Sequence, residues 1–295
     1  MLTSIPGHLV KRTSWNRLLK EPKKCIIYFL GPLLYTWAKS KHRSPENSLK
    51  VSFENLIDLI PVTASIIPVK TWTNVVPHNA FHRQGRAKAL ADTFAGYGSD
   101  KGRHGYAPIY QTIVDSIQNS NQILTIVEIG LGSSNPRIPS NMGVFGSPGA
   151  SLRAFRDFVS SANIIGGDID ASILFTEERI QTHYVNQLDK PSIETFLNHS
   201  RDFDLLVDDG LHDLDANLNT LCVGISRSKV GSWIVIEDID PLLSRERLAI
   251  SELIRDQFTS WVIQSNFALI FVAVRHSPAG TSRREARSLF PKFAT

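Results

Sequence analysis

The sequence predicts an α/β protein built on a doubly wound, mostly parallel sheet of seven strands. Short, near-continuous apolar runs alternate with helix-length segments between residues 123 and 274. Strands of this kind are typical of parallel sheets that helices cover on both faces. The 295 residues are 42% hydrophobic and 20% charged, as in a globular protein with a sizeable core. No internal repeat is apparent in the sequence, so a solenoid or propeller is not expected.

Each expected element follows from its local pattern in chain order. Strands are expected at Ile123–Ile129, Asn163–Gly167, Thr182–Asn186, Phe203–Asp208, Ser232–Glu237, Trp261–Gln264 and Ala268–Val274. Helices are expected at Pro108–Gln118, Ser151–Ser160, Ala171–Ile180, Pro191–Asn198, Asp213–Arg227 and Ser244–Phe258. A long loop rich in Gly, Ser, Pro and Asn, Ser133–Ala150, interrupts the alternation after the first strand.

Charge and proline content divide the chain into three predicted parts. Residues 1–90 carry 14 Lys and Arg against 4 Asp and Glu, a net charge of +10, and we expect a mainly helical segment there, with one helix at Ser52–Ile60. Residues 91–275 form the predicted catalytic domain, and residues 276–295 a polar tail. The basic segment suits an anionic partner or an oligomer contact. No aromatic–basic motif accompanies it, so nucleic acid is not an expected partner.

The longest apolar run, Cys25–Ala38, has 14 residues and contains Gly31-Pro32. About 20 residues are needed to span a bilayer, so the pattern favours a packed helix pair over a membrane span. Flanking lysines and an internal tryptophan leave open a segment that lies in a membrane interface. The two cysteines have neither metal-ligand nor disulfide spacing, which favours a reducing, cytoplasmic location.

Groups suited to a nucleoside follow the first three expected strands. They are Glu128, Gly130, Gly132, Asp168, Asp170 and Gln187. Glycines after a strand permit a tight turn and a close approach of a ligand. A carboxylate at the next strand tip can accept both hydroxyls of a ribose, and an amide can bind an adenine edge. The dinucleotide fingerprint is incomplete, because Asn135 stands where its third glycine would be.

Carboxylates and one histidine follow two later strands. They are Asp208, Asp209 and His212 after one strand, and Glu237 and Asp238 at the end of the next. Two strands joined by one helix are expected to be parallel neighbours, so these side chains should meet at one edge of the sheet. The pattern predicts a site for a hard divalent cation beside a general base. The structural alternative for Asp208 and for Asp213 is a helix N-cap.

The motifs EIGLGSSNP, GGDID, DDGLH and IED together resemble the class I S-adenosylmethionine-dependent methyltransferases, with a Rossmann-like fold. The resemblance is strongest to metal-dependent sugar O-methyltransferases of macrolide biosynthesis, the mycinamicin type, and covers roughly residues 90–275. It implies S-adenosyl-L-methionine as cofactor, Mg²⁺ bound by Asp209, Glu237 and Asp238, and His212 as the catalytic base beside Asp209. It also implies that Tyr97–Lys101 and His104–Tyr106 close over the methyl donor, with Asp208 on the cofactor side, and that the chain forms homo-oligomers.

The predicted activity is therefore metal-assisted methyl transfer to a sugar hydroxyl of a glycoside or polysaccharide precursor. The metal would orient neighbouring hydroxyls and favour the alkoxide, and His212 would take the proton. Two alternatives stay open. One is an antibiotic-pathway hydroxylase on the same fold, and the other is a non-catalytic nucleotide-binding or membrane-associated scaffold that binds its partner through the basic N-terminus. The absence of a recognisable two-histidine, one-carboxylate motif in the sequence counts against the hydroxylase.

Overall fold

The computed structural model describes residues 75–77, 85–118, 123–143, 146–200, 202–240, 250–251 and 253–277. All of them belong to one compact unit, Thr73–Thr295. The predictions made for residues 1–72, including the run Cys25–Ala38 and the helix Ser52–Ile60, and for the tail from residue 278 onward lie outside the described residues. Among the described residues, no helix is both long and apolar enough to cross a membrane.

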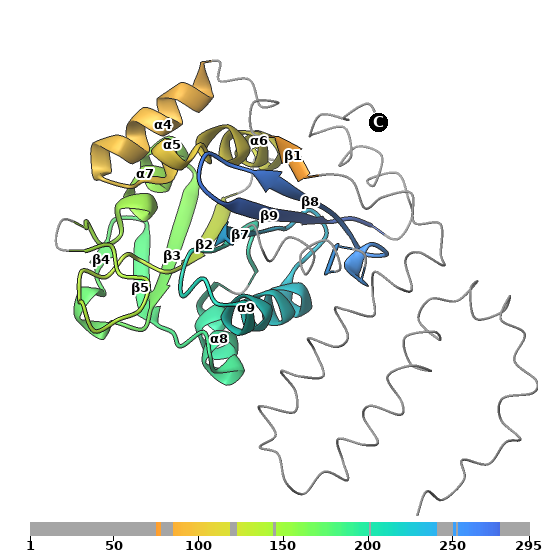
Figure 1. The fold of residues 1–295 in the computed structure, drawn as a ribbon. Coiled ribbons are helices and arrows are strands. Elements are labelled where there is room, and N and C mark those ends of the chain that lie inside the picture. The colour runs from red at the N-terminus through yellow and green to blue at the C-terminus, as the bar shows by residue number, and fades with distance from the viewer. Residues whose placement is uncertain are drawn as a thin grey trace, which may run out of the picture. The chain divides into compact units, whose positions relative to one another are not determined.

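A single mixed sheet organises the unit (Figure 1). Its strands are β1 (Val75–Pro77), β2 (Leu124–Ile129), β3 (Ala162–Asp168), β4 (Thr176–Glu177), β5 (Ile180–Tyr184), β6 (Leu205–Asp208), β7 (Trp233–Ile239), β8 (Phe258–Gln264) and β9 (Leu269–Arg275). Their order is β1-β8-β9-β7-β6-β2-β3-β5-β4. The strands β7, β6, β2, β3 and β5 run parallel, whereas β9 is antiparallel to both β7 and β8.

The seven predicted strands are confirmed, and two short strands extend the sheet at its edges. The edge strands β1 and β4 have three and two residues, too few to show a periodic pattern. The predicted helix Ala171–Ile180 is wrong. It is a single 3-10 turn, η2 (Ala171–Ile173), followed by β4 and by β5, which begins at Ile180. Of the predicted helix Ser244–Phe258, residues 250–251 and 253–254 are helical, and residues 244–249 and 252 lie outside the described residues. Phe258 itself begins β8.

Helices cover the two faces of the sheet as separate groups. They are α4 (Arg86–Tyr97), α5 (Lys101–His104), α6 (Ala107–Ile117), α7 (Ala150–Phe158), α8 (Lys190–Leu197) and α9 (Leu214–Arg227), with a further 3-10 turn, η3 (Asn198–Ser200). Figure 1 shows α4 to α7 on one side of the sheet and α8 with α9 on the other. The core accordingly has two halves, one per face.

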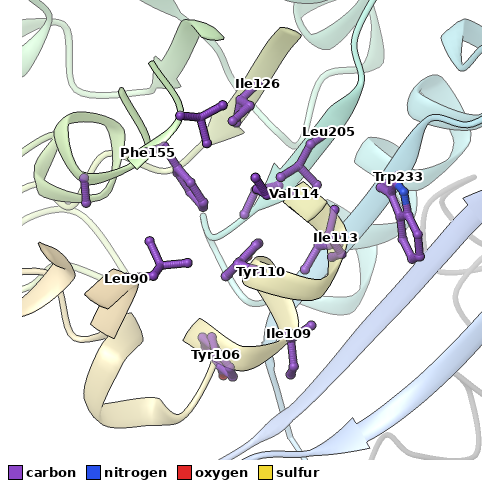
Figure 2. Packing of buried hydrophobic residues seen from close by; sticks show 14 of the residues in the cluster. Leu90, Tyr106, Ile109, Tyr110, Ile113, Val114, Ile126, Phe155, Leu205 and Trp233 are labelled. Carbon is purple, nitrogen blue, oxygen red and sulfur yellow. The ribbon is translucent and has the colours of Figure 1, made fainter. Parts of the chain in front are cut away.

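Alternation along the strands explains both halves of the core. Ile126 and Leu205 pack with α4, α6 and α7, whereas their neighbours Val127 and Leu206 pack with α8 and α9. Successive side chains of a strand point to opposite faces, so a strand covered on both faces must be apolar at every position. Figure 2 shows the first half, in which Phe155 and Tyr110 meet edge to face with ring centroids 5.1 Å apart.

Candidate active site

The candidate site lies at the carboxyl ends of three adjacent central strands, β7, β6 and β2. Glu128 of β2 pairs with Val207 of β6, and Asp208 of β6 pairs with Ile236 of β7. This parallel register brings the residues just after each pair to the same edge of the sheet. The predicted meeting of the two acidic strand ends is therefore found. Ligands of open α/β sheets bind at this edge.

Lys101 is the cation at the centre of these strand ends. Its Nζ lies 2.5 Å from Asp209 Oδ2, 2.7 Å from Glu237 Oε2 and 3.2 Å from Glu128 Oε1. The side chain is only 1% exposed. Burial by itself would lower the pKa of Lys101, but the surrounding carboxylates raise it well above its ordinary value. Lys101, predicted to close over the methyl donor, is thus placed among three carboxylates at the strand ends.

Glu237 and Glu128 are the most deeply buried of the three carboxylates that pair with Lys101. Glu237 also accepts a hydrogen bond from the Tyr110 hydroxyl, so protein groups reach both of its oxygens. Glu128 accepts a hydrogen bond of 2.8 Å from Ser151. Burial raises the pKa of both carboxyl groups, which Lys101 opposes. Glu128, predicted to bind the cofactor, is thus covered by Ser151 and Lys101.

Asp238 and His212 face each other with backbones in the left-handed region. Their φ angles are 50° and 58°, a conformation that costs a non-glycine residue about 1–3 kcal/mol and is common at functional sites. The Tyr106 hydroxyl donates to Asp238 Oδ1 at 2.5 Å, and His104 Nδ1 lies 3.5 Å from the same oxygen. Asp238 Oδ2 lies 3.9 Å from His212 Nε2.

Three of these side chains have the spacing of a metal-binding group. Asp209, His212 and Asp238 each offer one ligand atom, and these atoms lie within 4.8 Å of one another. Two carboxylates and an imidazole suit a divalent cation, and carboxylate oxygen is the donor that Mg²⁺ prefers. The donor set therefore fits the expected metal. Glu237, the third predicted ligand, lies outside this group and carries the contacts of Lys101 and Tyr110.

Two glycines bring the turn after β2 close to the rest of the site. Gly130 has a φ of 98°, and a Cβ there would lie 2.0 Å from the carbonyl oxygen of Asp209. Gly132 has a φ of 82°, and a Cβ there would lie 2.0 Å from Met142 Sδ. Only glycine meets both demands, left-handed backbone and close approach. The sequence motif therefore reflects steric need at this turn.

Two adjoining pockets open along this edge of the sheet. The first, called here the nucleoside pocket, is lined by Ile129, Gly130, Gly132, Ser133, Ile138, Pro139, Ser140, Asp168, Ile169, Val185, Asn186, Gln187, Leu188, Asp209, Gly210 and Leu211. The second, the carboxylate pocket, is lined by Ser99, Asp100, Gly130, Leu131, Gly132, Ser140, Asn141, Met142, Ser147, Ala150, Ser151, Asp209, His212 and Asp238. They share Gly130, Gly132, Ser140 and Asp209, so one molecule could occupy both.

Asp168 and Gln187, predicted to bind the cofactor, line the nucleoside pocket. Asp168 accepts the backbone N–H groups of Leu131 and Asp170 at 2.7 and 2.9 Å. These bonds fix its carboxylate at the pocket wall. Gln187 accepts the N–H of Leu211 at 2.8 Å and donates to Asp208 at 2.7 Å. Its amide therefore holds the loop after β6 as well as lining the pocket.

Asp170 and Asp208, also predicted to bind the cofactor, accept hydrogen bonds from neighbouring protein groups. Asp170 caps η2 by accepting from Ser172 and also accepts from Ser133 Oγ at 2.5 Å. Asp208 is fully buried and accepts from Asn217 at 3.1 Å. Neither lines the two pockets. Of the two helix-cap alternatives, Asp213 is the N-cap of α9, where it accepts from the Asp215 N–H.

Tyr97, predicted to close over the methyl donor, contacts helix α7. Its hydroxyl donates to Asp157 and lies 3.2 Å from Arg156 of α7, so it holds α4 to α7. The sequence reasoning missed Tyr110, although a signal was available. Tyr106 and Tyr110 are four residues apart at the start of α6, a spacing that places both on one helix face. That face meets the acidic ends of β7.

No protein-family model matches the chain. Over 151 residues it is 26% identical to 8-demethyl-8-alpha-L-rhamnosyl tetracenomycin-C 2'-O-methyltransferase of Streptomyces olivaceus, a match that covers 51% of this chain. The chain spans 37% of the length of that relative.

Solved structures of a methyltransferase from the mycinamycin biosynthetic pathway, MycE, share the fold. The structure with Mg and S-adenosylhomocysteine has a TM-score of 0.52 and 20% identity, over 65% of this chain and 56% of that one. The structure that also holds mycinamycin VI has a TM-score of 0.53 and 19% identity, over 67% and 55% of the two chains. The chain thus spans little more than half the length of these neighbours. Its described domain has the Rossmann-like fold of the class I methyltransferases, as the sequence predicts.

Proposed function

We propose that this chain is an S-adenosylmethionine-dependent O-methyltransferase that acts on a hydroxyl group of a sugar-containing acceptor. The observation that carries the proposal is the group formed by Asp209, His212 and Asp238, which lines a pocket that adjoins the nucleoside pocket. A base and a cation site beside a cofactor pocket are what methyl transfer to a weakly acidic hydroxyl requires. The methyltransferase fold supports the same reading.

The nucleoside pocket would hold the adenosine of the methyl donor. Asp168 is placed to accept the ribose hydroxyls, since its carboxylate is fixed at the end of β3 by two backbone N–H groups. Ile169 and Leu188 are 47% and 59% exposed beside it and offer apolar contact to a base. The turn at Gly130 and Gly132 then leads toward the carboxylate pocket, where the sulfonium and its methyl group would lie.

Asp209 and Asp238 would hold a divalent cation such as Mg²⁺. When bound, such a cation supplies Lewis acidity and stabilises the negative charge that develops on the acceptor oxygen. The protein supports this arrangement by fixing both carboxylates. Lys101 bonds to Asp209, and Tyr106 donates to Asp238, so neither side chain needs to be ordered when ligands bind.

His212 would act as the general base. Its Nε2 lies 3.9 Å from Asp238 Oδ2 in the lining of the carboxylate pocket, so the ring is placed to take the proton of an acceptor hydroxyl bound there. The acceptor oxygen then forms a bond to the methyl carbon, the carbon–sulfur bond breaks, and its electron pair stays on the sulfur of S-adenosylhomocysteine. General-base catalysis of this kind contributes about 10²–10⁴-fold. No covalent enzyme intermediate is needed.

The acceptor class follows from the relatives. One is named as a 2'-O-methyltransferase of a rhamnosyl tetracenomycin, and another, from the mycinamycin biosynthetic pathway, is solved with mycinamycin VI. A pocket wall of Ser99, Asp100 and Asn141 offers hydrogen bonds to further sugar hydroxyls. Among the described residues the metal-suited group has one histidine and two carboxylates, unlike the two-histidine, one-carboxylate set of iron oxygenases, which disfavours the hydroxylase alternative.

Calorimetric titration tests the cofactor assignment first. The full chain is titrated with S-adenosylmethionine and with S-adenosylhomocysteine, each in Mg²⁺ and in EDTA. Binding of both justifies a methyl-transfer assay with rhamnosides and other glycosides, in which EDTA should suppress turnover. Failure to bind either compound would remove the cofactor from the proposal and the activity with it.

Two further predictions concern partners that the described residues do not address. A homo-oligomer is expected from the resemblance, and light scattering of the purified chain measures it. The second prediction is peripheral membrane contact through residues 25–38. Co-sedimentation with anionic vesicles tests it by comparing the full chain with a variant that lacks those residues.

A further inference from the structure

We infer that Lys101 is a built-in cation of this site, which removes Glu237 from the metal-ligand set and leaves Asp209 and Asp238 as the carboxylates that hold a divalent cation. The inference rests on the metal site in the proposed function. It departs from the ligand set that the resemblance implies, in which Glu237 is a third carboxylate ligand.

The first support is that carboxylates already surround the ammonium group of Lys101, which donates hydrogen bonds to Asp209 and Glu237. An ammonium group has three donors, and Lys101 Nζ has three carboxylate partners, Glu128, Asp209 and Glu237. Each partner comes from the end of a different strand, β2, β6 and β7. One side chain thus ties together the three strands that form the site.

The second support is the contrast between Glu237 and Asp238, which are consecutive in the chain. Glu237 is 1% exposed, and Lys101 and Tyr110 take its two oxygens, Oε2 and Oε1. Asp238 has a side chain that is 26% exposed, and its Oδ2 faces His212 across the carboxylate pocket. Of these two consecutive residues, Asp238 therefore presents a carboxylate oxygen to the pocket and Glu237 does not line it.

The third support is that Lys101 has little freedom to leave. Its helix α5 begins three residues after Gly98 and ends at Gly105, both with left-handed backbone. Within it, a Cβ on Gly102 would lie 2.7 Å from the carbonyl oxygen of Ala91, so the backbones of α5 and α4 are in direct contact. The aliphatic chain of Lys101 is buried along with its charge. Exchange of the ammonium for a metal ion would require α5 to move.

Metal affinity of matched variants tests the inference without a turnover assay. Mn²⁺ binding is measured by calorimetry and by electron paramagnetic resonance for the full chain and for D209N, D238N, E237Q, K101M and K101M/E237Q. We expect D209N and D238N to lose at least about a hundredfold in affinity and E237Q to lose less than about tenfold, because only the first two remove ligands. K101M, which frees Glu237, should bind Mn²⁺ more tightly, and the added E237Q should abolish that gain.

The controls separate this inference from folding defects and from the proposed function. K88M removes an exposed lysine that pairs with Asp92 and should leave Mn²⁺ binding unchanged. Should K101M fail to fold, E237Q and the charge-matched K101M/E237Q still decide the matter. An E237Q that loses Mn²⁺ as severely as D238N would overturn the inference, as would a wild-type chain that binds no Mn²⁺. S-adenosylhomocysteine titration of the same samples reports separately on the cofactor assignment.

Discussion

The ammonium group of Lys101 lies 2.5 Å from Oδ2 of Asp209, although the two residues are 108 positions apart in the sequence. The short helix α5 thus supplies the counter-ion for a carboxylate at the carboxyl edge of the sheet. Removal of one partner from a buried ion pair typically costs about 3–5 kcal/mol, because the other charge remains without compensation.

The Lys101 ion pairs should therefore dominate the stability of this edge. We expect K101M to lower the free energy of unfolding by about 3–5 kcal/mol. K88M, which removes an exposed ion pair, should change it by no more than about 1 kcal/mol. Urea titration of both variants in EDTA checks the expectation. Equal stabilities of K101M and K88M would contradict the network described here.

Loss of His212 should lower the rate of methyl transfer strongly and leave cofactor affinity nearly unchanged. H212Q should lower kcat by about 10²–10⁴-fold, as expected for loss of a general base. Its affinity for S-adenosylhomocysteine should stay close to that of the wild type. D209N should lose turnover and metal binding together. Single-turnover assays and calorimetry measure the two effects, and an H212Q variant with normal turnover would remove His212 from the mechanism.

Stability should vary with pH through His104 and Asp238. The hydrogen bond to Asp238 raises the pKa of His104 above its ordinary value of 6.5. Burial would raise the pKa of Asp238, but bonds from His104 and Tyr106 lower it below 3.8. A histidine whose pKa is raised on folding stabilises the fold below pH 6.5. That contribution is lost as the pH rises through the pKa of the folded state. An aspartate whose pKa is lowered on folding stabilises the fold above pH 3.8. That contribution is lost as the pH falls through the pKa of the folded state.

His104 and Asp238 together should thus stabilise the fold most between pH 3.8 and pH 6.5, the ordinary pKa values of the two side chains. Calorimetric melting in EDTA buffers at several pH values from weakly acidic to weakly alkaline measures this dependence. As the pH rises above 6.5, the Tm of the wild type should fall more than the Tm of H104Q, which lacks the titrating ring. Parallel curves for the two proteins would show that His104 does not carry the dependence.

The turn at Gly130 should not tolerate a side chain. G130A places a Cβ 2.0 Å from the Asp209 carbonyl oxygen in a left-handed backbone. We expect a loss of about 2–4 kcal/mol from strain and overpacking. G96A is the matched control, because Gly96 lies in the exposed part of α4 with open space around its Cβ position. It should gain up to about 1 kcal/mol in helix propensity, which chemical denaturation measures.

Cofactor affinity should depend on Asp168 and not on the acidic residue at the next strand tip. D168A should weaken S-adenosylhomocysteine binding by about 10–100-fold, the value of a hydrogen bond to a charged group. D189A removes an exposed carboxylate that does not line the nucleoside pocket and should bind normally. Equal affinities for the two variants would exclude Asp168 from the ribose contact.

The sequence by itself determined the alternation of strands and helices, the parallel sheet and the edge at which the site lies. These follow from local patterns, since apolar runs that end in glycine or carboxylate identify strands and their exits. It also placed a larger set at this edge, because neighbouring parallel strands must bring their ends together: Asp208, Asp209, His212, Glu237 and Asp238. The structure groups three of them, Asp209, His212 and Asp238, with metal-binding spacing. The helix predicted at Ala171–Ile180 failed, since a two-residue strand leaves no periodic pattern and Asp170 caps only a single turn.

Only the tertiary structure decided which polar residues face a ligand and which are used inside the protein. Asp208 and Asp170 have the same residue type and similar positions as Asp209 and Asp168, but they accept hydrogen bonds from the side chains of Asn217 and Ser133. Lys101 and Tyr110 reach Glu237 from helices more than a hundred residues away in sequence. The physical reason is that burial and charge pairing depend on distances in space. Local sequence patterns fix which groups a strand end presents, but not which partners reach them.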